Sequence, residues 1–104
     1  MAVKINKDIA RQWLADVPEE KRFWCSNGKI LKNLAELESA LNEMSEETYI
    51  YHANAYKADF SNWVKDVIGD EVLAGFLLRS ISKSEAAGRV MDRITFLNRK
   101  IKGK

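Results

Sequence analysis

The chain has 104 residues, one cysteine and a formal net charge of +2, with 46% apolar and 31% charged residues. This length suits one domain that buries roughly two-thirds of its unfolded surface, and the composition excludes a disordered chain. The sequence has no apolar run of about 18 residues that would predict a membrane-spanning helix. Because the lone Cys25 cannot form an internal disulfide and no signal-peptide-like segment begins the chain, we expect a cytoplasmic protein.

The first expected element is a short helix over residues 7–16. Asn6 is a suitable N-cap for it. Val17 ends it, because the residue before Pro18 is pushed out of the α region.

A β-hairpin is expected near residues 22–31. Asn27-Gly28 is the commonest signal for a two-residue type I′ turn, and the alternation of sides places Phe23 and Cys25 on one face. The apolar residues that follow the turn also recur at helical spacing, so a helix beginning soon after it remains an alternative.

Further helices are expected over residues 34–44, 46–67, 71–80 and 84–102, the second of them broken near Ala58 and the third nearly all buried. The expected N-caps are Asn33, Ser45, Asp59, Asp70 and Ser82. Gly69 is expected to end a helix in the left-handed conformation. The sequence therefore predicts a mainly α fold, a compact bundle of five or six short helices with one short hairpin, in a single domain over residues 1–104.

Apolar and aromatic side chains recur at steps of four and three between residues 45 and 70, a spacing that places them on one helical face. They are Tyr49, Ala53, Tyr56, Phe60, Trp63 and Val67. Aromatic residues at such spacing are more often core than pocket lining, so we interpret this band as interior packing. Trp13 and Trp24 lie outside the band, and we expect one of them to stay exposed as a contact anchor.

The only histidine, His52, suggests a candidate polar or ligand site together with Asp59 and Trp63. A break near Ala58 would bring the carboxylate onto the imidazole and orient a general base. In the alternative interpretation His52 is a satisfied, half-buried polar residue, and Asp59 caps its own helix. No nucleophile or set of metal ligands accompanies the pair, so we name no catalytic residue, metal or cofactor, and we favour a protein that is not an enzyme.

The last helix combines an apolar seam with a basic end. Residues 89–104 carry six basic side chains and one acidic one, so their formal charge is +5, against −3 for the first 88 residues. The seam consists of Val90, Ile94, Leu97 and Ile101. A basic surface beside it consists of Arg89, Arg93, Phe96, Arg99 and Lys100. Solvated cations near a helix C-terminus would also suit the helix dipole.

These features favour a non-catalytic protein-interaction module that self-associates through the seam of its C-terminal helix, as a homodimer. Weak nucleic-acid binding by the basic surface is one alternative. A small-ligand or hydrolytic site at His52, Asp59 and Trp63 is another. The expected partner is thus a protein, which can be a second copy, or else a nucleic acid, and we expect no membrane partner.

Several residues between positions 23 and 78 form a recognisable pattern. They are Phe23-x-Cys25, Gly28, Leu34-x-Glu36-Leu37, Tyr51-His52, Asp59-Phe60-x-x-Trp63-x-x-x-Val67-x-x-Asp70 and Leu73-Ala74. This stretch resembles a small domain family of unknown function found in archaea and bacteria. The chain has Ala58 where the family has asparagine, so a side-chain role at that position does not carry over. The resemblance implies a compact prokaryotic domain and no particular activity.

Overall fold

The computed structural model describes residues 4–102, which form a mainly α bundle with one antiparallel hairpin. The helices are α1 (Lys7–Leu14), α2 (Leu34–Glu43), α3 (Glu46–His52), α4 (Asp59–Trp63), α5 (Glu71–Arg79) and α6 (Lys83–Ile101). The other elements are a 3₁₀ turn, η1 (Glu19–Lys21), the strands β1 (Phe23–Trp24) and β2 (Ile30–Leu31), and a π-helical turn, η2 (Val64–Ile68). The predicted fold class is confirmed. Within the described residues, no helix is both long and apolar enough to cross a membrane.

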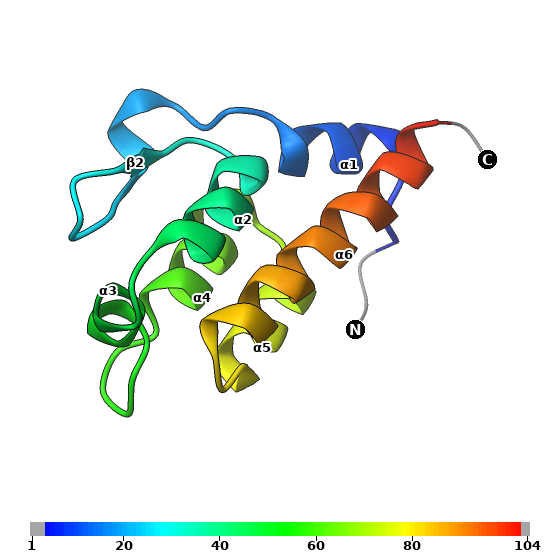
Figure 1. Cartoon of the computed structure of the whole chain (residues 1–104). Helices are drawn as coiled ribbons and strands as arrows, with labels where there is room; N and C mark the ends of the chain where they lie inside the picture. Colours follow the sequence, from blue (N-terminus) through cyan, green and yellow to red (C-terminus); the bar gives the residue numbers. More distant parts are fainter. Residues whose placement is uncertain (1–3, 103–104) are drawn as a thin grey trace.

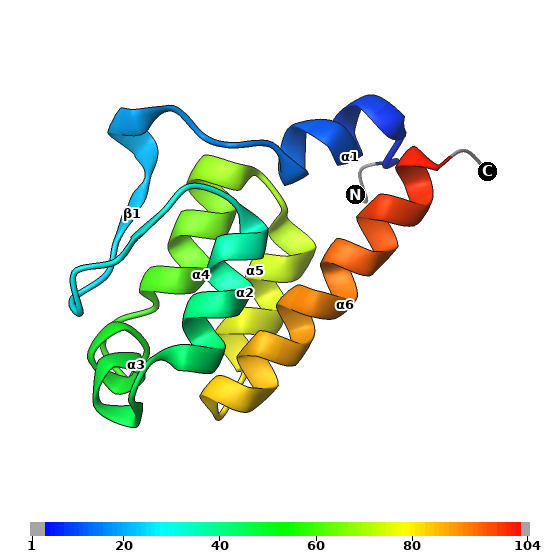
Figure 2. The ribbon, with the colours of Figure 1, turned by 45° about the horizontal axis from the view of Figure 1, so that its top comes forward.

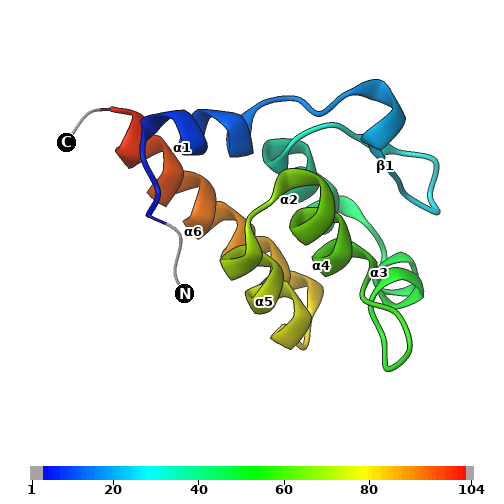
Figure 3. The same cartoon turned by 180° about the vertical axis from the view of Figure 1, so that it is seen from behind.

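Helix α2 lies near the centre of the bundle, and α6 packs along it (Figure 1). Helix α5 packs against both α4 and α6, as the rotated view also shows (Figure 2). Helix α1 crosses the C-terminal end of α6, whereas α3 lies at the opposite end of the molecule (Figure 3). The large side chains that are fully buried where these helices meet are Leu34, Leu37, Leu41, Val64, Asp70, Leu73, Val90 and Leu97.

Polar side chains cap most of the helices at their N-termini, as the sequence predicts. The residues that accept a backbone N–H in this way are Asn6, Asn33, Ser45, Asp70 and Ser82. Two glutamates complete the caps of α2 and α6: Glu36 accepts from the N–H of Lys32 at 3.0 Å and Glu85 from that of Ile81 at 2.9 Å. Each cap thus satisfies backbone donors that the first turn of a helix leaves without partners.

The predicted hairpin is present, and its two faces differ as expected. Phe23 pairs with Leu31, and Trp24 pairs with Ile30. Phe23 and Cys25 are buried, whereas Trp24 is 72% exposed. Since a single two-stranded sheet is marginal in water, the hairpin depends on the helices under its buried face.

The turn of the hairpin differs from the prediction. The N–H of Gly28 donates to the carbonyl of Cys25 at 3.0 Å, and Gly28 alone in this turn has a positive φ, of 93°. A type I′ turn requires positive φ at both central residues, and Asn27 has a negative one. The connection is therefore a three-residue loop that ends in a left-handed glycine.

The long helical stretch predicted over residues 46–67 is interrupted across residues 53–58, a wider break than the one expected near Ala58. The side chain of Asn54 accepts backbone N–H groups from Tyr56 at 2.8 Å and from the next residue at 3.1 Å, which stabilises a turn instead of a helix. Tyr56 is consequently 96% exposed and lies outside the aromatic band. Asp59 is the first residue of α4 and not its N-cap, because its carboxylate is engaged elsewhere.

Candidate functional site

His52 is a buried residue that connects three segments of the chain. It lies at the end of α3 with 4% of its surface exposed, and its Nδ1 is 2.9 Å from Oδ2 of Asp59 in α4. Its Nε2 accepts the backbone N–H of Ser26, in the hairpin loop, at 2.9 Å. Because a backbone N–H can only donate, Nε2 carries no proton, and a neutral imidazole donates from Nδ1 to the carboxylate. The structure therefore brings His52 and Asp59 together.

Aromatic rings enclose the imidazole. The ring centroids of Tyr51, Phe23 and Phe60 lie 4.9, 5.1 and 5.3 Å from that of His52. The Nε2 atom, which a general base would present to a substrate, is already occupied by the hairpin. Neither His52 nor Trp63 lines either of the two clefts described below. The two hydrogen bonds of His52 therefore connect the hairpin loop and α4 to the end of α3.

Trp63, the third member of the candidate polar site, also serves packing. Its indole Nε1 donates to the carbonyl of Lys21 at 2.8 Å, and its ring meets Phe23 edge-on at 5.9 Å. The interaction ties η1 to α4 across the core. The candidate site of His52, Asp59 and Trp63 is thus a packed cluster, in which the buried rings leave no opening for a small ligand.

The apolar seam of α6 faces the interior of the same chain, which corrects its assignment as a dimer surface. Val90 and Leu97 are fully buried, and Ile94 and Ile101 pack against the core. Helices α1 and α2 cover this face of α6. The seam therefore contributes to the core of its own chain, with two of its residues fully buried and two partly buried.

The basic surface of α6 is also smaller than predicted. Arg93 makes two bonds to Asp70, with Nε 2.7 Å from Oδ2 and Nη2 3.0 Å from Oδ1, and is largely buried. Its charge is therefore compensated inside the protein. Arg89, Phe96, Arg99 and Lys100 remain at the surface. Lys104, counted in the predicted basic end, lies outside the described residues.

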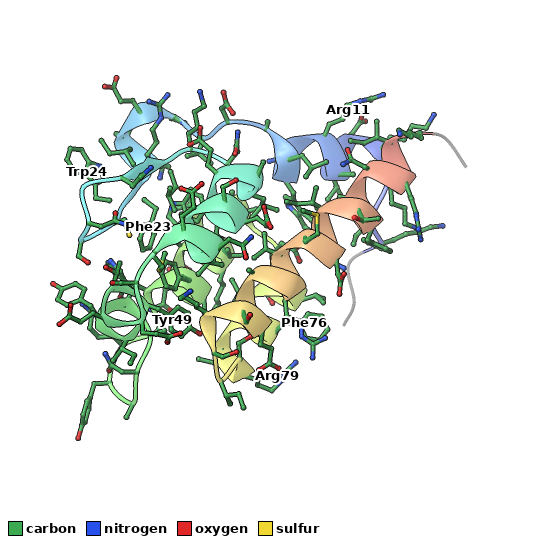
Figure 4. All side chains as sticks on the ribbon, in the orientation of Figure 1. Arg11, Phe23, Trp24, Tyr49, Phe76 and Arg79 are labelled. Atoms are coloured by element: carbon green, nitrogen blue, oxygen red, sulfur yellow. The ribbon has the colours of Figure 1, made fainter. Side chains whose placement is uncertain are left out.

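A cleft of about 270 Å³ lies between α3, the loop that follows it, and the junction of α5 with α6. We call it the α3–α5 cleft. Tyr49, Phe60, Leu77 and Ala86 are buried residues of its lining, and Tyr49 points into the bundle in Figure 4. Its exposed aliphatic residues are Ile50, Leu78 and Ile81, the last of them 91% exposed.

No pattern in the sequence indicates this cleft. Ile50 and Ile81 lie off every apolar stripe, and Leu78 belongs to α5, whose side chains we expected to be nearly all buried. Leu78 and Ile81 lie three residues apart, and this spacing alone does not distinguish an exposed pair from a buried one. They come together because α3 packs near the end of α5, a contact between distant segments.

Within residues 4–102, the lining of the α3–α5 cleft holds one carboxylate, that of Glu46. Burial raises the pKa of the Tyr49 hydroxyl above its ordinary value, and the carboxylates of Glu85 and Glu46 raise it further. Lys57 is the only cation among the described residues that line the cleft, and its Nζ lies 3.3 Å from Oδ2 of Asp59. Because Asp59 pairs with Lys57, the carboxylate of Glu46 is left to accept a cation beside an apolar group.

A second cleft of about 250 Å³ separates the hairpin from α2. Ile30 contributes to its lining, and the side chains of Lys29 and Glu43 span it at 3.7 Å. Trp24, paired with Ile30 across the hairpin, extends away from the helices in Figure 4, whereas Trp13 is partly buried. One of the two tryptophans outside the aromatic band is thus exposed, as expected.

Comparisons with known protein families, with curated proteins and with solved structures find no match. Within residues 4–102, no group of three or more His, Cys, Asp or Glu side chains is placed to hold a metal ion.

Proposed function

We propose that this chain is a non-catalytic interaction module that binds a segment of a partner protein in the α3–α5 cleft. The observation that carries the proposal is that three exposed aliphatic residues line one cleft: Ile50 from α3, and Leu78 and Ile81 from the end of α5 and the junction after it. Isolated exposed aliphatic residues are ordinary on a protein surface, but several around one concavity are typical of a binding site.

The size of the cleft suits side-chain anchors. Pockets for cofactors and drug-sized ligands are usually about 300–1,000 Å³. The α3–α5 cleft, at about 270 Å³, is smaller. Burying one aliphatic or aromatic side chain of the partner in it would contribute roughly 1.5–3 kcal/mol. A few such anchors dominate the binding energy of many protein interfaces.

The charged residues of the cleft indicate which charge the partner should carry. Glu46 lines the cleft and the one cation among its described lining residues, Lys57, is paired with Asp59 at 3.3 Å, so the cleft favours a partner with Lys or Arg next to its apolar anchor. The engagement of both nitrogens of His52 supports a role that is not catalytic. The seam of α6 is not part of this proposal.

The test is a selection of peptides from a random display library against the full chain. Enriched peptides should carry a large apolar residue next to Lys or Arg. Leu78→Asp should weaken their binding about tenfold or more, because it places a charge in an apolar cleft. Val72→Asp is the matched control, since Val72 is exposed on the same helix and does not line the cleft.

Both variants must give the circular dichroism and unfolding transition of the parent chain. Peptides that bind the parent and Leu78→Asp equally well, or a selection that enriches none, would refute the cleft as the binding site. Sedimentation of the parent chain tests whether a second copy occupies the cleft. A dimer that Leu78→Asp abolishes would mean that the partner is a second copy.

A further inference from the structure

Cations and aromatic rings alternate over the surface of α5 and α6. The guanidinium carbons of Arg79 and Arg89 lie 5.5 and 4.7 Å from the ring centroid of Phe76. Further along α6, Nζ of Lys100 lies 5.4 Å from the centroid of Phe96. We call these five residues the basic–aromatic strip. Figure 4 shows Phe76 and Arg79 together on the side of α5 near the start of α6.

The strip is long and crosses two helices. Arg89, Phe96 and Lys100 are spaced by seven and four residues, so they share one face of α6 over about 16 Å. Phe76 and Arg79 extend this face onto α5, because Arg89 packs over Phe76. Each long cation rests on a ring, which orders the side chain before any ligand binds.

Acidic groups near the strip only partly offset its charge. Glu85 lies 3.9 Å from Nη2 of Arg89, and Asp92 is the other acidic residue of α6. The buried Asp70 is matched by Arg93. The exposed cations that remain on these helices, from N- to C-terminus, are Arg79, Arg89, Arg99, Lys100 and Lys102. Helix α1, packed on the end of α6, adds Lys7, whereas its Arg11 lies 3.5 Å from Oδ1 of Asp8 in the same helix.

We propose that the basic–aromatic strip binds single-stranded nucleic acid. The cations contact successive phosphates, and unpaired bases stack on the guanidinium of Arg89 and on the exposed part of Phe96. An unpaired nucleotide presents a charged group and a flat π face together, which matches the alternation of cation and ring. A lipid headgroup or an acidic peptide would match the charges alone. This binding is independent of the α3–α5 cleft.

The test measures fluorescence anisotropy of a labelled, mixed-sequence single-stranded oligonucleotide with the full chain at several salt concentrations. Affinity should fall as salt rises, with a logarithmic slope of about −0.7 for each phosphate contacted. The double variant Arg79→Gln/Arg89→Gln should bind about tenfold more weakly or worse. The matched control is Lys29→Gln/Lys65→Gln, which removes the same charge from the hairpin and from η2.

A second arm separates nucleic acid from other anions. Phe96→Leu should weaken oligonucleotide binding several-fold while leaving the binding of inorganic polyphosphate unchanged, since a base can no longer stack. Arg89→Lys serves the same arm if the change at Phe96 affects folding, because it keeps the charge and removes the planar guanidinium on which a base stacks. Leu78→Asp should leave the oligonucleotide affinity unchanged, so this proposal and the peptide-binding proposal can fail separately.

Three results would overturn the proposal. One is the absence of oligonucleotide binding at low salt. Another is an equal loss of binding in the Lys29→Gln/Lys65→Gln control, which would show that only overall charge matters. The third is polyphosphate, or vesicles of anionic lipid, competing as strongly as the oligonucleotide, which would make the strip a general anionic surface.

Discussion

Asp70 and Arg93 are joined by two hydrogen bonds, of 2.7 and 3.0 Å, between a carboxylate that is wholly buried and a guanidinium from the middle of α6. The same carboxylate accepts the backbone N–H of Leu73 at 3.1 Å and so caps α5. One side chain therefore determines where α5 begins and also fixes α6 against it.

The first prediction concerns this ion pair. Arg93→Met should lower the free energy of unfolding by about 3–5 kcal/mol, because it leaves a buried carboxylate without its cation. Asp70→Asn combined with Arg93→Met should recover part of the loss, since asparagine is also a good N-cap. Urea unfolding measures both. A loss below about 1 kcal/mol in the single variant would show that the pair behaves like an exposed one.

The second prediction concerns the glycine that precedes Asp70. Gly69 has a φ of 100°, and a Cβ at this position would lie 3.2 Å from Nε1 of Trp13. Gly69→Ala should therefore cost more than the roughly 1–3 kcal/mol of backbone strain in this region. Gly28→Ala is the control, because Gly28 has a φ of 93° and no atom within 4 Å of the added Cβ. If thermal unfolding shows the same loss of stability in Gly69→Ala and Gly28→Ala, the contact with Trp13 adds nothing to the cost.

The third prediction concerns the two hydrogen bonds of His52, to Ser26 and to Asp59. His52→Leu should destabilise the protein by about 0.5–1.5 kcal/mol for each hydrogen bond it removes, one of which is the bond from the N–H of Ser26. Amide hydrogen exchange at Ser26 should accelerate. Asp59→Asn should have a smaller effect, because an amide oxygen can still accept from Nδ1. An unchanged exchange rate at Ser26 in His52→Leu would show that His52 does not protect this N–H.

The fourth prediction concerns alkaline pH. The pKa of Tyr49 is raised in the folded state, first by burial and then by Glu85 and Glu46. The unfolded chain therefore loses this proton first, and the contribution of Tyr49 to stability should be complete below its unfolded pKa of about 10 and decline as pH rises toward the folded value. Tyr49→Phe should flatten this decline. Urea unfolding of both proteins across that range provides the measurement, and parallel curves would contradict the prediction.

Local features of the chain could be predicted because they depend on residues close in sequence. The caps at Asn33, Asp70 and Ser82 were correct, since each side chain bonds an N–H three residues ahead. The hairpin was found from its aromatic alternation and its Asn-Gly turn. The exact turn was wrong, because the backbone of Asn27 does not take the left-handed conformation that a type I′ turn requires.

The surface of α6 could not be predicted in the same way. Periodicity identified Val90 and Leu97 as one apolar face, but the same pattern describes a face that packs inside the chain and one that packs on a second copy. Likewise, the spacing of Arg93 with Arg89 suggested an exposed basic surface, whereas Asp70, 23 positions away, binds Arg93 in the interior.

The sequence alone thus determined that this protein is a helical bundle with a hairpin, and where most of its helices begin, because those features follow from short-range hydrogen bonding and side-chain periodicity. Tertiary structure alone decided that His52 is enclosed, that the seam of α6 is internal, and that Ile50, Leu78 and Ile81 share a cleft. The reason is physical: burial and surface complementarity arise from contacts between segments that are distant in the chain, which no local pattern encodes.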